Sequence, residues 1–483
     1  MGNVLKGLVP ERVFSIFELL SSVPHGSGNT KAVSDLCVGF ARERGLEYVQ
    51  DGFNNVIIKK PASAGYEDRP PVILQAHLDM VCAVNPDRPV DMSREPVKLV
   101  TDGEYVWADG TSLGADDMIG VACALALLDD GEAAHPPLEV LLTTDEETGM
   151  YGASGLDVSA LAGKRLINLD SEDEGVITAG CAGGLHLDSR LELHRRRVAA
   201  ESVFYRLCVS GLLGGHSGAE IDRERGNSNL IAARIIREAS EAKPRLCSFE
   251  GGVFDNVIPS ETLATFAVPR EFAKKAEELV RLSASALKDE YAASEPGLEI
   301  TLEKTAACAS AVTFADTLRA ATLLLLLPNG VMNMNIELPG LVETSLSTGI
   351  AKLDGSRFGF TTFIRSSSDN RKQSVFRRVR ALIEDVFGGT VKIRGNYPAW
   401  RYRSDSELLA SVKDAYFRIS GKEAVVFATH GGLECGIFCG KIPGLDCVSI
   451  GPDMSDIHSV NERLNVASVG RFYELLRSAV AGL

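Results

Sequence analysis

Three short apolar runs in the first part of the chain end at, or shortly before, a histidine or an acid. They are Val72–His77, Leu138–Thr143 and Arg165–Leu169. Apolar runs of this length are typical of buried strands, and residues 119–128 between them have the length and character of a buried helix. Strands separated by helices predict an α/β unit with a mainly parallel sheet flanked by helices. In such sheets ligands bind beyond the carboxyl ends of the strands, where these polar residues fall.

The pattern changes after Gly184. Residues 185–193 and 203–209 alternate apolar and polar side chains, which predicts half-exposed antiparallel strands. Two successive sets of strands and helices follow and indicate an inserted α+β domain built from two similar halves. A chain of 483 residues also exceeds what one hydrophobic core usually serves. We therefore predict a first domain formed by residues 1–184 and 397–483, interrupted by a second domain at residues 185–396.

Charge and composition exclude several classes of partner. The net charge of −15 argues against nucleic acid or an anionic membrane as a ligand. No stretch approaches the roughly 20 apolar residues that span a bilayer, and the N-terminal residues lack a secretory apolar region. The ten cysteines follow no regular framework, which is typical of reduced thiols. We expect a cytoplasmic protein.

The end of the first apolar run places a histidine and an aspartate one residue apart. If the segment stays extended, His77 and Asp79 project to the same face. His77 can then bind a metal ion while Asp79 orients a neighbouring group. A pair of this kind taken alone is more often structural, so the interpretation depends on the residues that accompany it.

Further candidate ligands occupy similarly placed turns. Each has a simpler explanation when taken singly: an aspartate capping a helix, solvated turn acids, or an exposed loop histidine. Together they would give each of two ions a histidine and a carboxylate, with one bridging carboxylate and one spare acid to act as a base. Two divalent ions are therefore expected, and zinc, manganese and cobalt all suit such ligands. The residues are Asp116, Glu146, Glu147, Asp170 and His458.

Seven segments, in this combination and order, resemble the M20 family of co-catalytic metallopeptidases over nearly the whole chain. Within that family the sequence is most similar to the cytosolic aminoacyl-histidine dipeptidases, also called peptidase D or Xaa-His dipeptidases. The segments are QAHLDMV, TSLGADDMIG, TTDEETGMYGA, NLDSED, GLLGGHSGAEID, HGGLECG and SIGPDMSDIHSVNE.

The resemblance implies a role for each candidate residue. One metal ion would be held by His77 and Asp170, and the other by Glu147 and His458. Asp116 would bridge the two ions. Glu146 would be the general base, and Asp79 would orient His77. The family's fold is an α/β catalytic domain with an inserted lid domain, which agrees with the organisation inferred above.

The resemblance also points to residues of the inserted domain that would act on the substrate. His216 would be a lid histidine that reaches the oxyanion on closure, its alternative being a loop histidine used only for packing. Arg365 would clamp the substrate's free carboxylate, its alternative being an exposed strand arginine. Asn256 and His430 are further candidates for substrate contact.

One position departs from the subfamily pattern. Asp117 and Met118 follow Asp116, where Asn-Gly is expected. The additional acid adds negative charge near the metals, which bears on substrate preference and not on the number of metals.

The sequence thus predicts a two-metal dipeptidase that cleaves small unblocked dipeptides, with Xaa-His as the leading class. A related aminopeptidase or tripeptidase, or an amidase or deacylase, would use the same centre. A metal-binding protein without turnover is the alternative outside enzymes, and the spare acid Glu146 argues against it. Small peptides are the expected partners, and the long insertion is a candidate contact for a homodimer.

Overall fold

A computed structural model describes residues 3–483, and these divide into two compact units. The first unit contains the residues up to Gly180, together with Trp400–Ala428 and Leu433–Leu483. The second unit contains Cys181–Ala399 and the short segment Thr429–Gly432. The chain therefore leaves the first unit and returns to it. These boundaries lie a few residues from the positions inferred from sequence, and only the segment at 429–432 has no counterpart there.

An eight-stranded mixed sheet forms the centre of the first unit. Its strands β6, β3, β7 and β21 run parallel to one another, while the pairs β1–β2, β2–β6 and β8–β21 are antiparallel. In spatial order the strands are β1 (Glu47–Gln50), β2 (Val56–Lys60), β6 (Leu138–Thr143), β3 (Val72–His77), β7 (Arg165–Asn168), β21 (Asp446–Ser449), β8 (Val176–Cys181) and β20 (Val425–Thr429).

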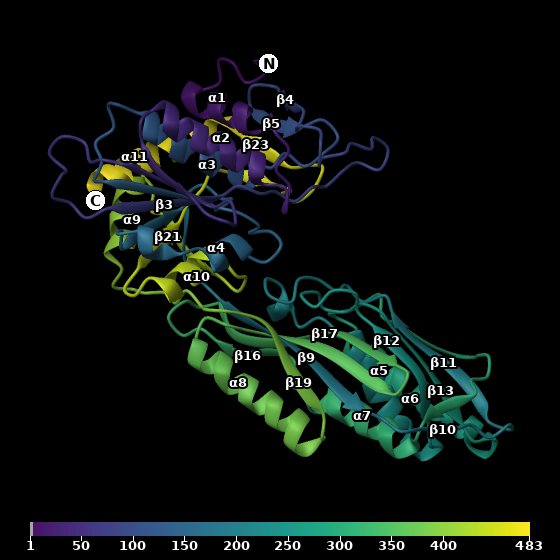
Figure 1. The fold of residues 1–483 in the computed structure, drawn as a ribbon. Helices are drawn as coiled ribbons and strands as arrows, with labels where there is room; N and C mark the ends of the chain where they lie inside the picture. The colour runs from purple at the N-terminus through teal and green to yellow at the C-terminus, as the bar shows by residue number, and fades with distance from the viewer. Residues whose placement is uncertain (1–2) are drawn as a thin grey trace. The chain divides into compact units, whose positions relative to one another are not determined.

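Side-chain alternation divides this sheet into a face that joins the main hydrophobic core and a second face that carries the polar residues of the site. On β3, Leu74 and Ala76 join the main hydrophobic core, whereas Gln75 and His77 project to the opposite face. Helices α1, α2, α3, α9 and α11 contribute further residues to that core. Figure 1 shows α1, α2 and α3 on one side of β3, with α4 and α10 on the other. The helices are α1 (Glu11–Leu20), α2 (Lys31–Glu43), α3 (Ala115–Asp129), α4 (Tyr151–Gly155), α9 (Glu407–Ser420), α10 (Glu434–Lys441) and α11 (Val466–Gly482).

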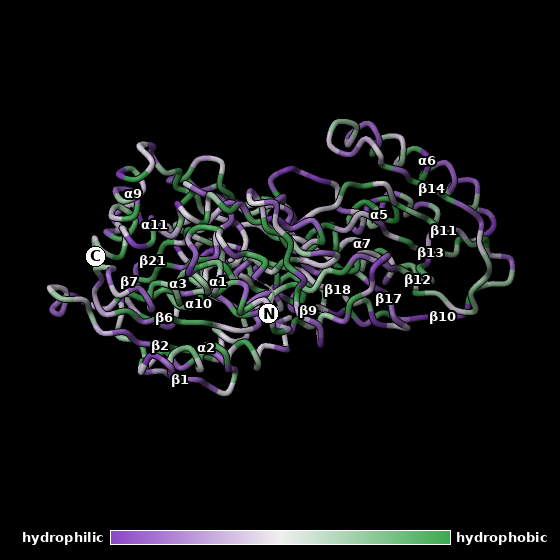
Figure 2. The backbone as a smooth tube through the Cα atoms, turned by 90° about the horizontal axis from the view of Figure 1, so that it is seen from above, coloured by the Kyte–Doolittle hydropathy of each residue, from purple (hydrophilic) through white to green (hydrophobic). Residues whose placement is uncertain are grey.

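After Asp117, helix α3 is apolar on all sides, as expected of a helix that lies inside the unit. Every residue from Ala115 to Leu128 is buried, and Figure 2 shows the helix as an apolar stretch of the interior. A small four-stranded sheet accompanies this unit and consists of β22 (Met454–Ser455), β23 (Arg463–Asn465), β5 (Tyr105–Ala108) and β4 (Leu99–Thr101).

The second unit is built on a nine-stranded sheet whose paired strands are all antiparallel. Its main path runs through β14 (Glu299–Lys304), β11 (Val203–Ser210), β13 (Thr262–Val268), β12 (Arg245–Gly251), β17 (Val342–Asp354), β18 (Arg357–Ser366), β9 (Gly183–Glu192) and β19 (Thr390–Tyr397), and β16 (Gly330–Met334) pairs with β17. A separate two-stranded ribbon joins β10 (Arg195–Arg197) to β15 (Ser310–Val312).

Four helices and one face of this sheet enclose a second hydrophobic core. The helices are α5 (Ser228–Glu238), α6 (Ala273–Glu290), α7 (Phe314–Leu326) and α8 (Asp369–Ala381). Asn227 caps α5 and Thr313 caps α7, each through a side chain that accepts a backbone N–H of the first turn. The predicted mixed α/β fold class is thus confirmed. The two similar halves expected of the inserted domain stay a prediction. Among the described residues, no helix is both long and apolar enough to cross a membrane.

Candidate metal centre

The centre of the candidate site is His77, the last residue of β3. Its imidazole is almost fully buried, and the Nδ1 atom lies 3.0 Å from the backbone carbonyl oxygen of Asp79. Because that carbonyl accepts a hydrogen bond from Nδ1–H, the Nε2 atom of the neutral ring keeps its lone pair. Nε2 faces acids of the neighbouring turns. A neutral ring that carries its proton on Nδ1 is the tautomer required of a histidine that binds a metal through Nε2.

Asp79 lies beyond the end of the strand, and its carboxylate has other partners. The carboxylate oxygen nearest to His77 Nδ1 is 3.5 Å away, farther than the Asp79 carbonyl oxygen. The same carboxylate accepts the backbone N–H of Glu146 at 3.0 Å and of Glu147 at 3.3 Å, and the hydroxyl of Ser27 at 2.8 Å. Asp79 therefore fixes the turn that carries the two glutamates and contacts His77 mainly through its backbone.

Asp116 lies where two imidazoles meet, and its two carboxylate oxygens face different histidines. Oδ1 is 3.1 Å from His77 Nε2, and Oδ2 is 3.0 Å from His458 Nε2. The backbone at Asp116 and Asp117 is not helical, so regular helix begins only after them, although α3 starts at Ala115. One carboxylate with its oxygens directed apart is the geometry of a bridging ligand.

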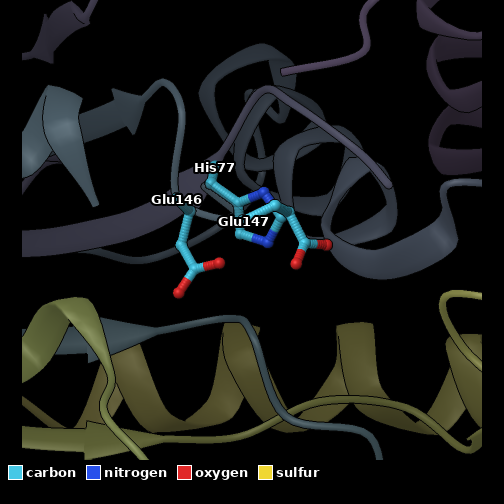
Figure 3. Close-up of side chains that lie close together, drawn as sticks. All are labelled: His77, Glu146 and Glu147. Atoms are coloured by element: carbon cyan, nitrogen blue, oxygen red, sulfur yellow. The ribbon is translucent and has the colours of Figure 1, made fainter. Parts of the chain in front are cut away.

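The remaining candidate ligands complete two groups that share Asp116. Asp170 Oδ1 is 3.4 Å from His77 Nε2, and Glu147 Oε1 is 2.9 Å from His458 Nε2. In each group the three ligand atoms lie within 4.8 Å of one another. Glu146 joins a third such group with His77 and Glu147, shown in Figure 3.

Asp117, the additional acid next to Asp116, is fully buried beside this cluster. Its Oδ2 atom accepts the backbone N–H of His77 at 3.2 Å. Burial, together with the charge of Asp116, raises its pKa well above the ordinary range. Met118 is also fully buried and packs in the main core. Asp117 therefore fixes the backbone of His77 through a hydrogen bond, and Met118 is a core residue.

The pKa values show how strongly these groups interact. Burial would lower the pKa of His77, but Asp170, Asp116 and Asp79 raise it well above its ordinary value. Hydrogen bonds that His458 donates to the carboxylates of Asp116 and Glu147 raise its pKa to about 10. Burial and neighbouring carboxylates raise the pKa of Glu146 well above the range of an exposed glutamate.

The cluster has the composition that divalent cations require. Its donors are carboxylate oxygens and imidazole nitrogens, which zinc-type ions accept. Among the described residues, no lysine or arginine pairs with Asp116, Glu147 or Asp170, so their charge is balanced only by histidines. Closely spaced buried carboxylates repel one another strongly unless cations lie between them. The residues present therefore fit two cations sharing Asp116.

Glu462 is a structural participant that the sequence reasoning missed. Its buried carboxylate accepts the backbone N–H groups of Leu113, Gly114 and Ala115 at 2.7, 2.9 and 2.8 Å. It thereby joins the loop of His458 to the turn that presents Asp116. The only sequence signal was its place in the segment SIGPDMSDIHSVNE, four residues after His458.

Glu434 is a second acid that the sequence reasoning left without a role. Oε2 accepts hydrogen bonds from Gln75 Nε2 and Thr143 Oγ1, both at 2.6 Å. Burial raises its pKa to about 7. Gln75 lies two residues before His77 on the same face of β3, so Glu434 lies one step deeper than the cluster, on the polar face of the sheet. Its only sequence signal was its place in the segment HGGLECG.

The candidate substrate residues lie in the second unit. Arg365 Nη2 is 3.3 Å from His216 Nε2, and His430 Nε2 is 2.7 Å from Ser345 Oγ, whose residue pairs with Arg365 across β17 and β18. Burial and the charge of Arg365 lower the pKa of His216 to about 4 and that of His430 to about 3. Asn256 is exposed, and its carbonyl accepts the N–H of Ser217 at 2.8 Å. Arg365 is buried, so the alternative of an exposed strand arginine is wrong.

A parallel-rich α/β unit with imidazoles and carboxylates converging just beyond its strand ends has the architecture of a metal-dependent hydrolase. Residues 73–481 match peptidase family M20/M25/M40. The chain belongs to this family.

Two similar proteins cover nearly the whole chain. The cytosol non-specific dipeptidase of Escherichia coli (strain K12) is 39% identical over 473 residues, which is 98% of this chain and 97% of that protein. The crystal structure of the aminoacylhistidine dipeptidase of Vibrio alginolyticus aligns with a TM-score of 0.90 and 37% identity, covering 99% of this chain and 97% of that one. The aminopeptidase PepT of Bacillus cereus, at 16% identity and a TM-score of 0.58, shares the fold. The predicted membership of the M20 metallopeptidases is confirmed.

Proposed function

We propose that the protein is a dipeptidase that hydrolyses small unblocked dipeptides, including Xaa-His, with two divalent ions held by the cluster around Asp116. The observation that carries this proposal is the pair of ligand groups sharing Asp116, with Glu146 beside them. The names of the Escherichia coli and Vibrio alginolyticus relatives support dipeptides as the substrate class and cytosol as the location. Zinc is the first candidate metal, and manganese and cobalt are alternatives.

The residues divide into ligands and a base. His77 and Asp170 would hold one ion, Glu147 and His458 the other, with Asp116 bridging both. Ions held there would polarise the scissile carbonyl, acidify water and offset the charge of the surrounding carboxylates.

Glu146 is the carboxylate of the cluster that forms no ion pair with a histidine, among the described residues. The Asp79 carboxylate fixes its turn by accepting its backbone N–H. From this position Glu146 would accept a proton from the attacking water and then deliver it to the leaving amine. Asp79 would act by holding this turn, and through its carbonyl it would keep the Nε2 lone pair of His77 free.

The second unit supplies candidate substrate contacts. Arg365 is a buried guanidinium that we propose as the receptor for the substrate's free carboxylate. His216 contacts Arg365, and burial and the charge of Arg365 lower its pKa to about 4, so it would act at the oxyanion as a neutral imidazole that adds no charge. Asn256 and His430 remain proposed substrate contacts.

The decisive experiment combines a dipeptide panel with metal analysis of the same preparation. Replacing the proposed base, in Glu146→Gln, should lower kcat at least about 100-fold while two metals per chain remain bound. Asp173→Asn, which changes an exposed acid of a neighbouring turn, is the control and should keep full activity. Full activity of Glu146→Gln would refute its role as a base. Failure of the wild type on every dipeptide, with both metals bound, would refute the substrate class.

A further inference from the structure

The strand β18 separates two chemical environments in the second unit. Phe358, Phe360 and Ile364 project into the core beneath the helices. Phe363 and Arg365 lie two residues apart and therefore project together to the opposite face of the sheet. Phe363 is 3% exposed and yet is not part of the helix-covered core. A large buried aromatic ring on the polar face needs a reason other than core packing.

Phe363 forms two ring contacts on that face. Its ring stacks on His186, the residue opposite it on β9, with centroids 3.6 Å apart and planes 23° from parallel. The guanidinium carbon of Arg365 lies 3.9 Å from the centroid of the same ring. A cation–π contact of this kind restricts the guanidinium without neutralising its charge. Phe363 therefore holds Arg365 in a way that an acidic partner does not.

The charge of Arg365 is left without a carboxylate. Among the described residues it forms no ion pair, and its Nε atom has no hydrogen-bond partner although it is buried. Asp255 is near enough to affect Arg365 electrostatically, but it is already paired. It lies 3.1 Å from His186 Nδ1 and also pairs with Arg394 Nη2. A buried cation without a counter-ion is costly, so this arrangement fits an anion that arrives from solution.

We propose that Phe363 is a positioning residue that, supported by His186, fixes Arg365 as the receptor for the terminal carboxylate of the substrate. Pairing with His186 and Arg394 keeps Asp255 from competing for that receptor. This inference rests on the proposed function, because it takes Arg365 to be the carboxylate receptor. It implies that the preference for peptides with a free C-terminal carboxylate over their amides depends on Phe363, although Phe363 does not contact the peptide.

The experiment compares a dipeptide with its C-terminal amide on the metal-loaded enzyme. Phe363→Leu should raise KM for the free dipeptide about tenfold, with kcat changed less than about twofold and with little effect on the amide. Calorimetric binding of reduced-bond alanyl-alanine, whose scissile carbonyl is replaced by a methylene, should weaken by the same factor. Phe360→Leu is the matched control: it makes the same change three residues earlier on β18, in the core, and should leave the preference for carboxylate unchanged.

Two further variants keep the inference open to refutation if Phe363→Leu does not fold. Phe363→Tyr keeps the ring and should retain a KM near that of the wild type. His186→Asn removes the stacked ring from a position that is partly exposed, and should raise KM for the free dipeptide in the same direction. An unchanged KM in His186→Asn, or equal effects of Phe363→Leu and Phe360→Leu, would overturn the positioning role.

A separate variant tests the proposed function on which this inference rests. Arg365→Met should abolish the preference for the free carboxylate over the amide. If the preference survives in Arg365→Met, Arg365 is not the receptor and the proposed function loses that contact. If Arg365→Met abolishes the preference while Phe363→Leu keeps it, the receptor is correct and only the role of Phe363 is wrong.

Discussion

Removing the carboxylate of Glu462 should weaken metal binding although Glu462 is not a proposed ligand. The carboxylate accepts three backbone N–H groups in the turn that leads into Asp116, at 2.7 to 2.9 Å. Glu462→Ala leaves these donors without their partner. The turn then loses its fixed conformation, and Asp116 no longer directs one oxygen to His77 and the other to His458. Both proposed metal positions depend on that orientation.

The size of the effect follows from the hydrogen bonds. Each bond to a charged acceptor contributes about 1.5 kcal/mol, so three contribute about 4.5 kcal/mol. Removing a buried charge recovers part of this, since burial raises the pKa of Glu462 despite the three donors. A net loss of about 3 kcal/mol in the free energy of unfolding is expected, which corresponds to a fall of roughly 6–12 °C in Tm. Metal affinity should fall about 10- to 100-fold, as for other residues that orient ligands.

The assay measures Tm of the metal-free protein by calorimetry and metal affinity by competition with a chelator of known strength. Glu474→Ala is the control because it changes an exposed glutamate of α11, and it should alter neither quantity. Glu462→Gln, which keeps one acceptor oxygen, should fall between the wild type and Glu462→Ala. A lower Tm with unchanged metal affinity would refute the link to Asp116. An unchanged Tm would refute the energetic argument itself.

Three further outcomes test other parts of the site. Removing metals with a chelator should lower Tm by at least about 5 °C and re-addition should restore it, because cations bind only the folded cluster; equal Tm values would contradict the metal centre. In the metal-free protein, burial raises the pKa of Glu434 from 4.5 to about 7. The folded state therefore binds the proton more tightly, so stability should fall as pH rises from 4.5 to 7, and Glu434→Gln should flatten that slope in a denaturant titration. Gly218→Ala should raise KM for free dipeptides, because the added Cβ would lie 3.0 Å from Arg365 Nε and 2.9 Å from His216 Cε1; a KM equal to that of the wild type would show that the cluster tolerates the methyl group.

The buried parallel strands were predictable because a short, mainly apolar run in the sequence marks each of them. The ranges expected for β3 and β6, Val72–His77 and Leu138–Thr143, are those that the structure shows. The start of α3 was not predictable, because the backbone at Asp116 and Asp117 departs from helix within an otherwise helical sequence. Local pattern cannot show such a departure, since it depends on contacts such as that between Glu462 and Leu113, which are 349 residues apart.

Short or mixed-polarity elements escaped the sequence analysis for a different reason. Helix α10 contains Gly436 and Gly440, which weaken intrinsic helix preference, and its buried residues Ile437 and Phe438 form it through tertiary packing. Strand β12 carries alternating exposed polar residues and a register shift, so its apolar signal is diluted. Both elements depend on neighbours distant in sequence.

The polar cluster of the first unit lies just beyond strand ends, whereas that of the second unit includes Arg365 within a strand. This difference explains why the sequence indicated the first cluster more readily than the second. In the first unit the polar residues follow strand ends, so acids after an apolar run mark the site. In the second unit Arg365 lies within a strand, where alternation alone makes it look like an ordinary exposed residue. Its burial comes from the polar face itself, through the ring of Phe363 and the contact with His216. The sequence-level signal for such a site is an aromatic residue two positions before an arginine on the outward face of a strand.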